Sequence, residues 1–190
     1  MGSGDWNDGM NRVGDQQRGE SVWLGFFLHD TLRRFIALAN ARGDEHRAHW
    51  CQEQADTLRK NLEQHAWDGE WYRRAWFDNG TPLGSKQSEE CRIDSISQSW
   101  SVLSGVAAPE RAQQALDSLY THLVRKGAQL IQLLDPPFDK TSEDPGYIRG
   151  YVPGVRENGG QYTHAAVWAA MAFAHQGDAT RAWELAGMIN

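Results

Sequence analysis

The sequence has no uninterrupted apolar stretch near the roughly 20 residues that a membrane-spanning helix requires. It has no basic excess either: 19 Lys and Arg stand against 25 Asp and Glu, a net charge of −6, which argues against nucleic-acid binding. Its two cysteines, Cys51 and Cys91, have neither metal-site nor CxxC spacing, so we expect free thiols. No P-loop, dinucleotide-binding fingerprint or Ser-His-Asp order is present. Function must therefore be sought in the aromatic residues and the loops.

Tryptophan is abundant, with nine among 190 residues, beside five Tyr and six Phe. One interpretation is a helical core built from large aromatic side chains. The other is carbohydrate recognition, because flat aromatic faces stack on the C–H faces of sugars while polar neighbours bind the hydroxyls. Composition alone leaves both interpretations open.

Six stretches carry apolar residues at helical spacing, and they come in pairs joined by short turns. Asp44 is placed to cap the second stretch, and Pro109 lies in the first turn of the fourth. Residues 70–77 alternate around aromatics before the turn signal Asp78-Asn79-Gly80, which predicts a small β-hairpin. The predicted helices span residues 21–41, 45–66, 94–105, 109–124, 162–175 and 179–190.

The links between the predicted helix pairs are long, at residues 67–93 and 126–161. In a chain of antiparallel helix hairpins, links of one type lie on one face. We therefore expect both long links and the segment before the first helix to share a face that carries the site. The predicted fold is all-α, an α/α toroid of the six-hairpin type with about three hairpins present and a small β-hairpin in a long loop.

The sequence begins directly on a glycine-rich motif and ends within an apolar helical stretch. We therefore expect residues 1–190 to form a single partial domain, about half of a closed toroid and the C-terminal part of a catalytic domain. Such a piece exposes the apolar faces of its end hairpins, so homodimerisation is a further expectation.

The motif Gly4-Asp5-Trp6-Asn7-Asp8-Gly9-Met10-Asn11 combines two carboxylates, two amides and an indole. Cleavage of a glycosidic bond needs an acid that protonates the leaving oxygen and groups that hold the ring. Spacing does not distinguish Asp5 from Asp8 as that acid. One alternative is a calcium loop, although the motif is one residue short of that pattern. Another is a turn with Asx caps before a helix.

The motif Glu157-Asn158-Gly159-Gly160-Gln161-Tyr162-Thr163-His164 leads into the fifth predicted helix. Backbone N–H groups at a helix N-terminus bind anions, and a histidine in the first turn can join them. Glu157 could act as a base or bind sugar hydroxyls. The alternative is a capped helix start with a buried structural histidine.

These motifs resemble those of the cellobiose and chitobiose phosphorylase family. The resemblance covers the chain from end to end, and Pro136–Thr141 with Asp144–Tyr151 resembles in particular the phosphorylase-like domain of cyclic β-1,2-glucan synthases. The segments that carry the family resemblance are Gly4–Asn11, Gly19–Trp23, Ile93–Trp100 and Glu157–His164.

The resemblance implies an α/α toroid that catalyses inverting phosphorolysis of β-glucosidic bonds, with β-1,2-glucan as the expected substrate. Phosphate would attack the anomeric carbon while Asp8 protonates the leaving sugar. The resemblance places Trp6 at the −1 sugar, Glu157 at the acceptor sugar and His164 at the phosphate. More weakly, the resemblance implies that Asn7, Gln98 and Tyr162 bind the substrate beside these residues.

Inorganic phosphate is then the co-substrate, and neither a cofactor nor a metal is expected. Because phosphate is already anionic, one acid suffices, and burial would keep such an acid protonated. An inverting hydrolase would need a second carboxylate about 6.5–9.5 Å away, for which Glu157 is the candidate. The alternatives are therefore an inverting glycoside hydrolase or a non-catalytic sugar-binding or helical interaction module.

In the family, further ligands of the −1 sugar precede the acid, and a phosphate-binding loop follows the histidine. Both fall outside residues 1–190, so we expect the isolated chain to be inactive. In the synthases, membrane-spanning and glycosyltransferase regions lie elsewhere in the polypeptide, which implies a position for this domain on the cytoplasmic side of a membrane.

Overall fold

A computed structural model describes residue 1 and residues 4–189, and it confirms all six predicted helices within a residue or a few of their predicted ends. The second helix ends in a π-helical turn, Leu62–Ala66. Two single-turn 3-10 helices lie in the loops, η1 (Asp8–Met10) before the first α-helix and η4 (Tyr147–Gly150) before the fifth. The α-helices are α1 (Val22–Ala41), α2 (Glu45–Asn61), α3 (Ser95–Leu103), α4 (Pro109–Leu123), α5 (Thr163–His175) and α6 (Ala179–Ile189).

Polar side chains fix where three of the helices begin. The Asp44 carboxylate accepts a hydrogen bond from Arg47 N at 2.9 Å, which confirms the predicted cap of α2. Asp94 caps α3 in the same way, through Ile96 N at 2.9 Å. The hydroxyl of Ser21 caps α1. Pro109 opens α4, where its missing N–H costs no helical hydrogen bond.

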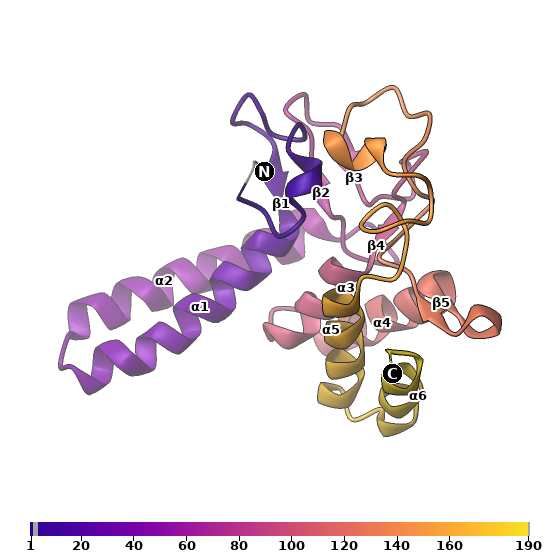
Figure 1. The fold of residues 1–190 in the computed structure, drawn as a ribbon. Coiled ribbons are helices and arrows are strands. Elements are labelled where there is room, and N and C mark those ends of the chain that lie inside the picture. The colour runs from indigo at the N-terminus through magenta and orange to yellow at the C-terminus, as the bar shows by residue number, and fades with distance from the viewer. Residues whose placement is uncertain (2–3, 190) are drawn as a thin grey trace.

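Each helix packs against its partner in the pair, α1 with α2, α3 with α4 and α5 with α6. The first members also pack on one another, α1 with α3 and α3 with α5. Figure 1 shows the α1–α2 hairpin extending away from the other four helices. None of the helices in the described part of the chain is both long and apolar enough to cross a membrane.

The predicted β-hairpin is present but belongs to a larger sheet. Strands β2 (Ala75–Trp76) and β3 (Pro82–Leu83) pair antiparallel around the turn at Gly80, whose φ is +84°. Strand β1 (Glu20–Ser21) adds to β2, with Ser21 opposite Ala75. This pairing ties the segment before α1 to the first long link. Two short ladders join β4 (Ile93–Asp94) to β7 (Leu134–Asp135) and β5 (Val124–Arg125) to β6 (Leu130–Ile131).

The segment before α1 and the two long links lie together at one end of the helices (Figure 1), which confirms the predicted shared face. Arg12 donates to Asp144 at 2.6 Å, and Asn79 donates to Glu143 at 2.9 Å. The three segments also share a small apolar core. That core contains Met10, Val13, Ala75, Phe77, Leu83, Cys91, Leu134, Phe138 and Ile148.

The largest core cluster lies among α3, α4, α5 and α6, with Leu116, Leu119 and Phe173 fully buried. A second cluster joins α1 to α3 and α5 through large aromatics, including Trp23, Phe26 and Trp100. Both cysteines are free, as expected, and both are buried. The segment before α1 and the two long links together form the loop end of the molecule, and the helical core lies beneath it.

We expect Leu116→Ala to lower the free energy of unfolding by about 2–5 kcal/mol, because it opens a cavity in a fully buried position. Urea unfolding followed by tryptophan fluorescence measures this loss. Gln113→Ala, at an exposed position of the same helix, is the control and should change stability by about 0.5 kcal/mol or less. Equal losses in the two variants would contradict this description of the core.

Candidate active site

The loop that carries the predicted acid runs along the top of the helices and turns through η1. Met10 N donates to Asn7 O at 3.0 Å, which closes the turn, and Met10 is fully buried beneath it. The alternation of buried and exposed residues along the loop is regular: Asp5 and Asn7 are buried, whereas Asp8 is exposed. The two carboxylates that spacing could not distinguish therefore stand in different environments.

Asp5 belongs to a buried ionic group centred on Arg74 of the β-hairpin. The Arg74 side chain is fully buried; it donates to the Asp5 carboxylate and, at 3.0 Å, to Ser21 Oγ. Its Nε lies 3.3 Å from an Asp94 oxygen, although the two are not aligned for a hydrogen bond. Asp5 also accepts from the Ser21 hydroxyl and from Asn7 N. The group thereby joins the acid loop to β1, β2 and the start of α3.

The pKa values of the two carboxylates in this group, Asp5 and Asp94, are shifted in opposite directions. Burial alone would raise the pKa of Asp5, but the charge of Arg74 and the hydrogen bonds from Arg74, Ser21 and Asn7 lower it below the ordinary value. Burial raises the pKa of Asp94 to about 6, against the opposing effect of Arg74. Asp5 is thus held as a buried carboxylate, whereas Asp8 is accessible from solvent.

Asp8 is exposed. The burial that we expected to keep this acid protonated is therefore not found. The neighbour of Asp8 is η4, which packs on η1 and begins with Tyr147. Hydrogen bonding to the Asp8 carboxylate is the main cause that raises the pKa of Tyr147 to about 12. The charge of Glu157 raises the pKa of the same phenol to a smaller extent.

The indole of Trp6 is hydrogen-bonded to the imidazole of His164, in the first turn of α5. Trp6 Nε1 donates to His164 Nδ1 at 2.9 Å. A nitrogen that accepts carries no proton, so this bond assigns the imidazole proton to Nε2. Among the described residues, none caps the start of α5 with its side chain. His164 therefore offers an N–H donor at a helix N-terminus, the arrangement that favours anions.

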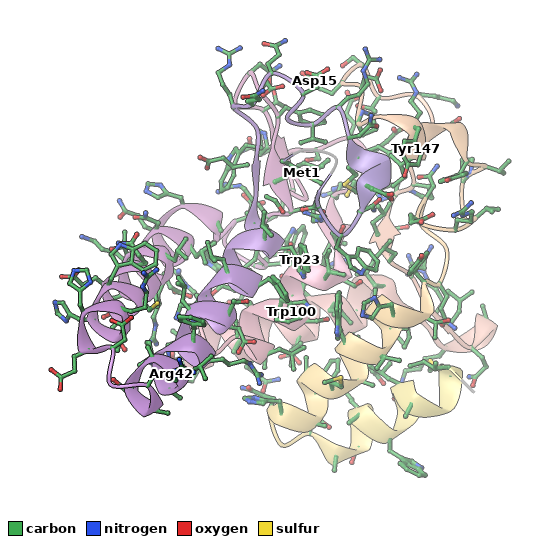
Figure 2. The ribbon with its side chains drawn as sticks, turned by 60° about the vertical axis from the view of Figure 1, so that its left-hand side comes forward. Met1, Asp15, Trp23, Arg42, Trp100 and Tyr147 are labelled. Atoms are coloured by element: carbon green, nitrogen blue, oxygen red, sulfur yellow. The ribbon has the colours of Figure 1, made fainter. Side chains whose placement is uncertain are left out.

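Aromatic rings continue from Trp6 into the helical core. Trp6 contacts Tyr162 edge-on at 5.2 Å between ring centroids, and His164 lies 4.0 Å from Trp168. Trp168 in turn meets Trp100 at 5.2 Å. Figure 2 shows Trp100 on α3 below the loop end of the molecule. The same tryptophans therefore serve both as helical core and as the floor beneath the loop.

Glu157 lies on a rigid turn that precedes α5. Its side chain is 11% exposed, and Oε2 lies 3.4 Å from Arg156 Nε. The next residue, Asn158, is fully buried and bonds the backbone of Phe138 in both directions, at 2.7 and 2.8 Å. Asn158 also donates to Tyr151 O at 2.8 Å. The turn that presents Glu157 is therefore fixed to the rest of the long link.

Two predicted substrate neighbours occupy unexpected positions. Gln98 is fully buried, and its amide bonds the N and O of Tyr72 and the carbonyl of Asp94 at 2.8–3.0 Å. This arrangement fastens the hairpin to α3 and differs from the predicted sugar contact, since every polar atom of the side chain is engaged by backbone. Asn7 is also buried, but its amide has no hydrogen-bond partner among the described residues.

Sequence reasoning missed Arg74. It treats Tyr147 and Tyr151 as a pair suited to a sugar subsite, but it missed the contact of Tyr147 with the loop at η1. Arg74 occupies a buried position of the hairpin. The feature of the sequence that could have revealed it is a charged residue within a segment of alternating aromatics. Tyr147 had only its place in a Pro/Gly-rich loop, which does not identify a neighbour so far away along the chain. Across residue 1 and residues 4–189, no three metal-ligating side chains gather into a candidate metal site.

Comparison with known proteins assigns the chain to a class of carbohydrate-active catalytic domains. The description "Glycosyl hydrolase 94 superfamily, catalytic domain" matches residues 1–190, and the chain belongs to that family. It is 52% identical over 187 residues to the cyclic beta-(1,2)-glucan synthase NdvB of Rhizobium meliloti (strain 1021). That match covers 98% of this chain and 7% of the synthase.

Phosphorylases are also similar to the chain. Identity is 35% over 187 residues to the 3-O-beta-D-glucopyranosyl-beta-D-glucuronide phosphorylase of Paenibacillus borealis, covering 97% of the chain and 24% of that protein. It is 34% over 188 residues to the N,N'-diacetylchitobiose phosphorylase of Vibrio proteolyticus, covering 98% of the chain and 23% of that protein. The chain thus spans less than a quarter of the length of each of these relatives, and the resemblance seen in the sequence is confirmed.

The Asp94 carboxylate should make stability fall as pH rises from about 4 to about 6. Its folded pKa of about 6 exceeds the ordinary value near 4, so in this window the folded state binds more protons than the unfolded state. In Asp94→Asn that dependence is removed, while an N-cap acceptor remains. We expect the variant to gain stability relative to the natural protein between pH 4 and pH 6.

Urea unfolding at pH 4, 5, 6 and 7 measures the difference between the two proteins. Asp44→Asn makes the same change at an exposed helix cap and is the matched control. A stability difference for Asp94→Asn that stays constant over this range would show that the buried carboxyl does not titrate as described.

Proposed function

We propose that the chain is part of a catalytic domain that cleaves β-glucosidic bonds by inverting phosphorolysis, with β-1,2-glucan as substrate and inorganic phosphate as co-substrate. The observation that carries this proposal is the difference in environment between the two aspartates of the loop. Asp5 is paired with Arg74, whereas Asp8 is exposed and lies two residues from Trp6, which is bonded to His164. One available acid beside an anion-binding imidazole suits phosphate as the nucleophile.

In this proposal Asp8 gives its proton to the leaving glycosidic oxygen as phosphate attacks the anomeric carbon from the opposite face. His164 binds the phosphate through Nε2–H, assisted by the uncapped N-terminus of α5. Trp6 and the unpartnered amide of Asn7 hold the −1 sugar. Glu157 and Tyr162 contact the acceptor sugar. No other cofactor enters the reaction.

The fold that we propose for the complete domain is the six-hairpin α/α toroid, with α1–α6 as three of its hairpins. The packing of α1 on α3 and of α3 on α5 supports this arrangement, because the first helices of successive hairpins form the inner ring of a toroid. The loop end, which carries Asp8 and His164, then becomes one mouth of the ring. Family membership supports the same proposal.

The reaction is tested with the full-length polypeptide that contains this segment. Incubation with β-1,2-glucan and inorganic phosphate should release α-glucose 1-phosphate, because inversion converts the β linkage to the α anomer. Omission of phosphate is the control and should abolish the product. Release of free glucose without phosphate would instead favour the hydrolase, and equal rates on β-1,3- or β-1,4-glucan would contradict the proposed linkage.

Asp8→Asn in the same polypeptide should reduce turnover by about 10²–10⁴-fold, the range that general acid catalysis contributes. The side chain is exposed, so the unfolding midpoint should not change. Steady-state rates of glucose 1-phosphate release and a thermal unfolding curve measure the two effects. Turnover that survives the substitution would remove Asp8 from the acid role.

A further inference from the structure

A groove lies where the three-stranded sheet meets the start of α1 and the end of α2. Its volume is about 830 Å³, inside the range of about 300–1,000 Å³ that is typical of ligand sites. Figure 1 shows β1 leading directly into α1, which forms one side of this junction. Among the described residues that line the groove, none belongs to the set proposed above to contact substrate or phosphate. The groove is therefore a second concave surface beside the candidate active site.

The buried side chains that line the groove are all apolar: Val22, Leu62, Ala66 and Phe77. Gly25 lets α1 approach the end of the second hairpin helix closely, because a Cβ at this position would lie 3.0 Å from a Leu62 methyl carbon. The facing segment is the π-helical turn Leu62–Ala66. Turns of this kind are rare and are frequent at functional sites. An uncommon backbone feature thus shapes the base of the groove.

The sheet contributes an indole to the groove. Side chains alternate along a strand, so Ala75 points into the small core of the loop end while Trp76 points to the opposite face. There Trp76 is partly buried and lines the groove. A flat aromatic ring that stays accessible on one side is suited to stacking on the C–H face of a sugar.

The charged side chains of the groove balance one another. Two cations, Arg18 and Arg73, stand against two anions, Glu20 and Asp78. Arg73 already donates to the Asp68 carboxylate at 2.6 Å. Asp78 accepts backbone N–H groups of the segment before β1 at 2.8–2.9 Å. This balance favours a neutral polar ligand over phosphate or a strongly charged chain.

Three exposed polar side chains accompany the indole. Glu20 lies directly opposite Trp76 in the β1–β2 ladder, so the two side chains are neighbours on one face of the sheet. Asn61 and His65 come from the helical side of the groove, at the end of α2 and in the π-helical turn. All three are exposed. A carboxylate, an amide and an imidazole beside an aromatic ring form the combination that binds sugar hydroxyls and a sugar face together.

We propose that this groove is an accessory binding site for a neutral oligosaccharide, in which the Trp76 indole stacks on a sugar ring and the Glu20 carboxylate accepts from its hydroxyls. The site breaks no bond. It holds a glucan chain on the enzyme and so raises the effective concentration of substrate near the candidate active site. The choice of β-1,2-glucan as the ligand rests on the proposed function, whereas the groove and its chemistry do not.

The test is isothermal titration of the full-length polypeptide with long β-1,2-glucan, in an Asp8→Asn background so that the glucan is not consumed. Two binding events are expected, one at the candidate active site and one at the groove. Trp76→Ala should weaken the second event about tenfold, because stacking and burial of the ring are lost. Glu20→Gln should weaken it about threefold, because a charged hydrogen-bond acceptor is replaced by a neutral one.

Trp50→Ala removes an exposed tryptophan from the same helix hairpin but outside the groove, and is the matched control, with both events expected unchanged. Trp76 also packs against the second core cluster, so thermal unfolding accompanies each titration. If Trp76→Ala is misfolded, the double variant Glu20→Gln with Asn61→Ala decides the question, because both side chains are exposed. With Asp8 restored, the groove variants should keep the kcat of the natural protein on the β-1,2-linked disaccharide.

The same titrations with β-1,3- and β-1,4-glucan separate the groove from the choice of linkage. A folded Trp76→Ala variant that binds all three glucans as the natural groove does would overturn the proposal. A variant that is less stable but binds glucan unchanged would overturn it too, and would show that another segment of the polypeptide covers the groove. A full-length polypeptide that cleaves no glucan, yet binds one through Trp76, would contradict the proposed function and leave the accessory site in place.

Discussion

The loop end of this domain depends on one buried cation. Arg74 has no exposed side-chain atoms and lies between two carboxylates, Asp5 and Asp94, which come from segments far apart in the chain. Removing an ion from water costs several kcal/mol, and only close partners offset that cost. The guanidinium therefore requires the acid loop, the β-hairpin and the start of α3 to meet at one point. Each of these segments is short, and none could hold its position alone.

This constraint also explains why the two aspartates of the loop stand in different environments. Proximity to Arg74 keeps Asp5 ionised and buried, while the turn at η1 directs Asp8 outward. A loop with a single carboxylate would have to use it either to hold the loop in place or to react. In the proposed mechanism this separation lets Asp5 hold the loop in place while Asp8 stays accessible as the acid.

The helices could be predicted because their information is local. Apolar spacing, the cap at Asp44 and the proline at the start of α4 lie within each segment, and the alternating link lengths were enough to place the loops on one face. The role of Arg74, the contact of Tyr147 with η1 and the structural role of Gln98 could not be predicted, because each depends on a partner that only folding brings near. Strands of two residues, such as β1, carry too little alternation to be recognised.

The hydrogen bond between Trp6 and His164 has a thermodynamic consequence. In the proposed roles the indole contacts the sugar and the imidazole contacts the phosphate, so one bond connects two binding events. If a sugar shifts the indole, the imidazole loses or strengthens its partner, and the affinity for phosphate changes by the corresponding factor. Reciprocity requires that phosphate alter the affinity for sugar by the same factor. The two substrates would then bind as cooperative ligands instead of independent ones.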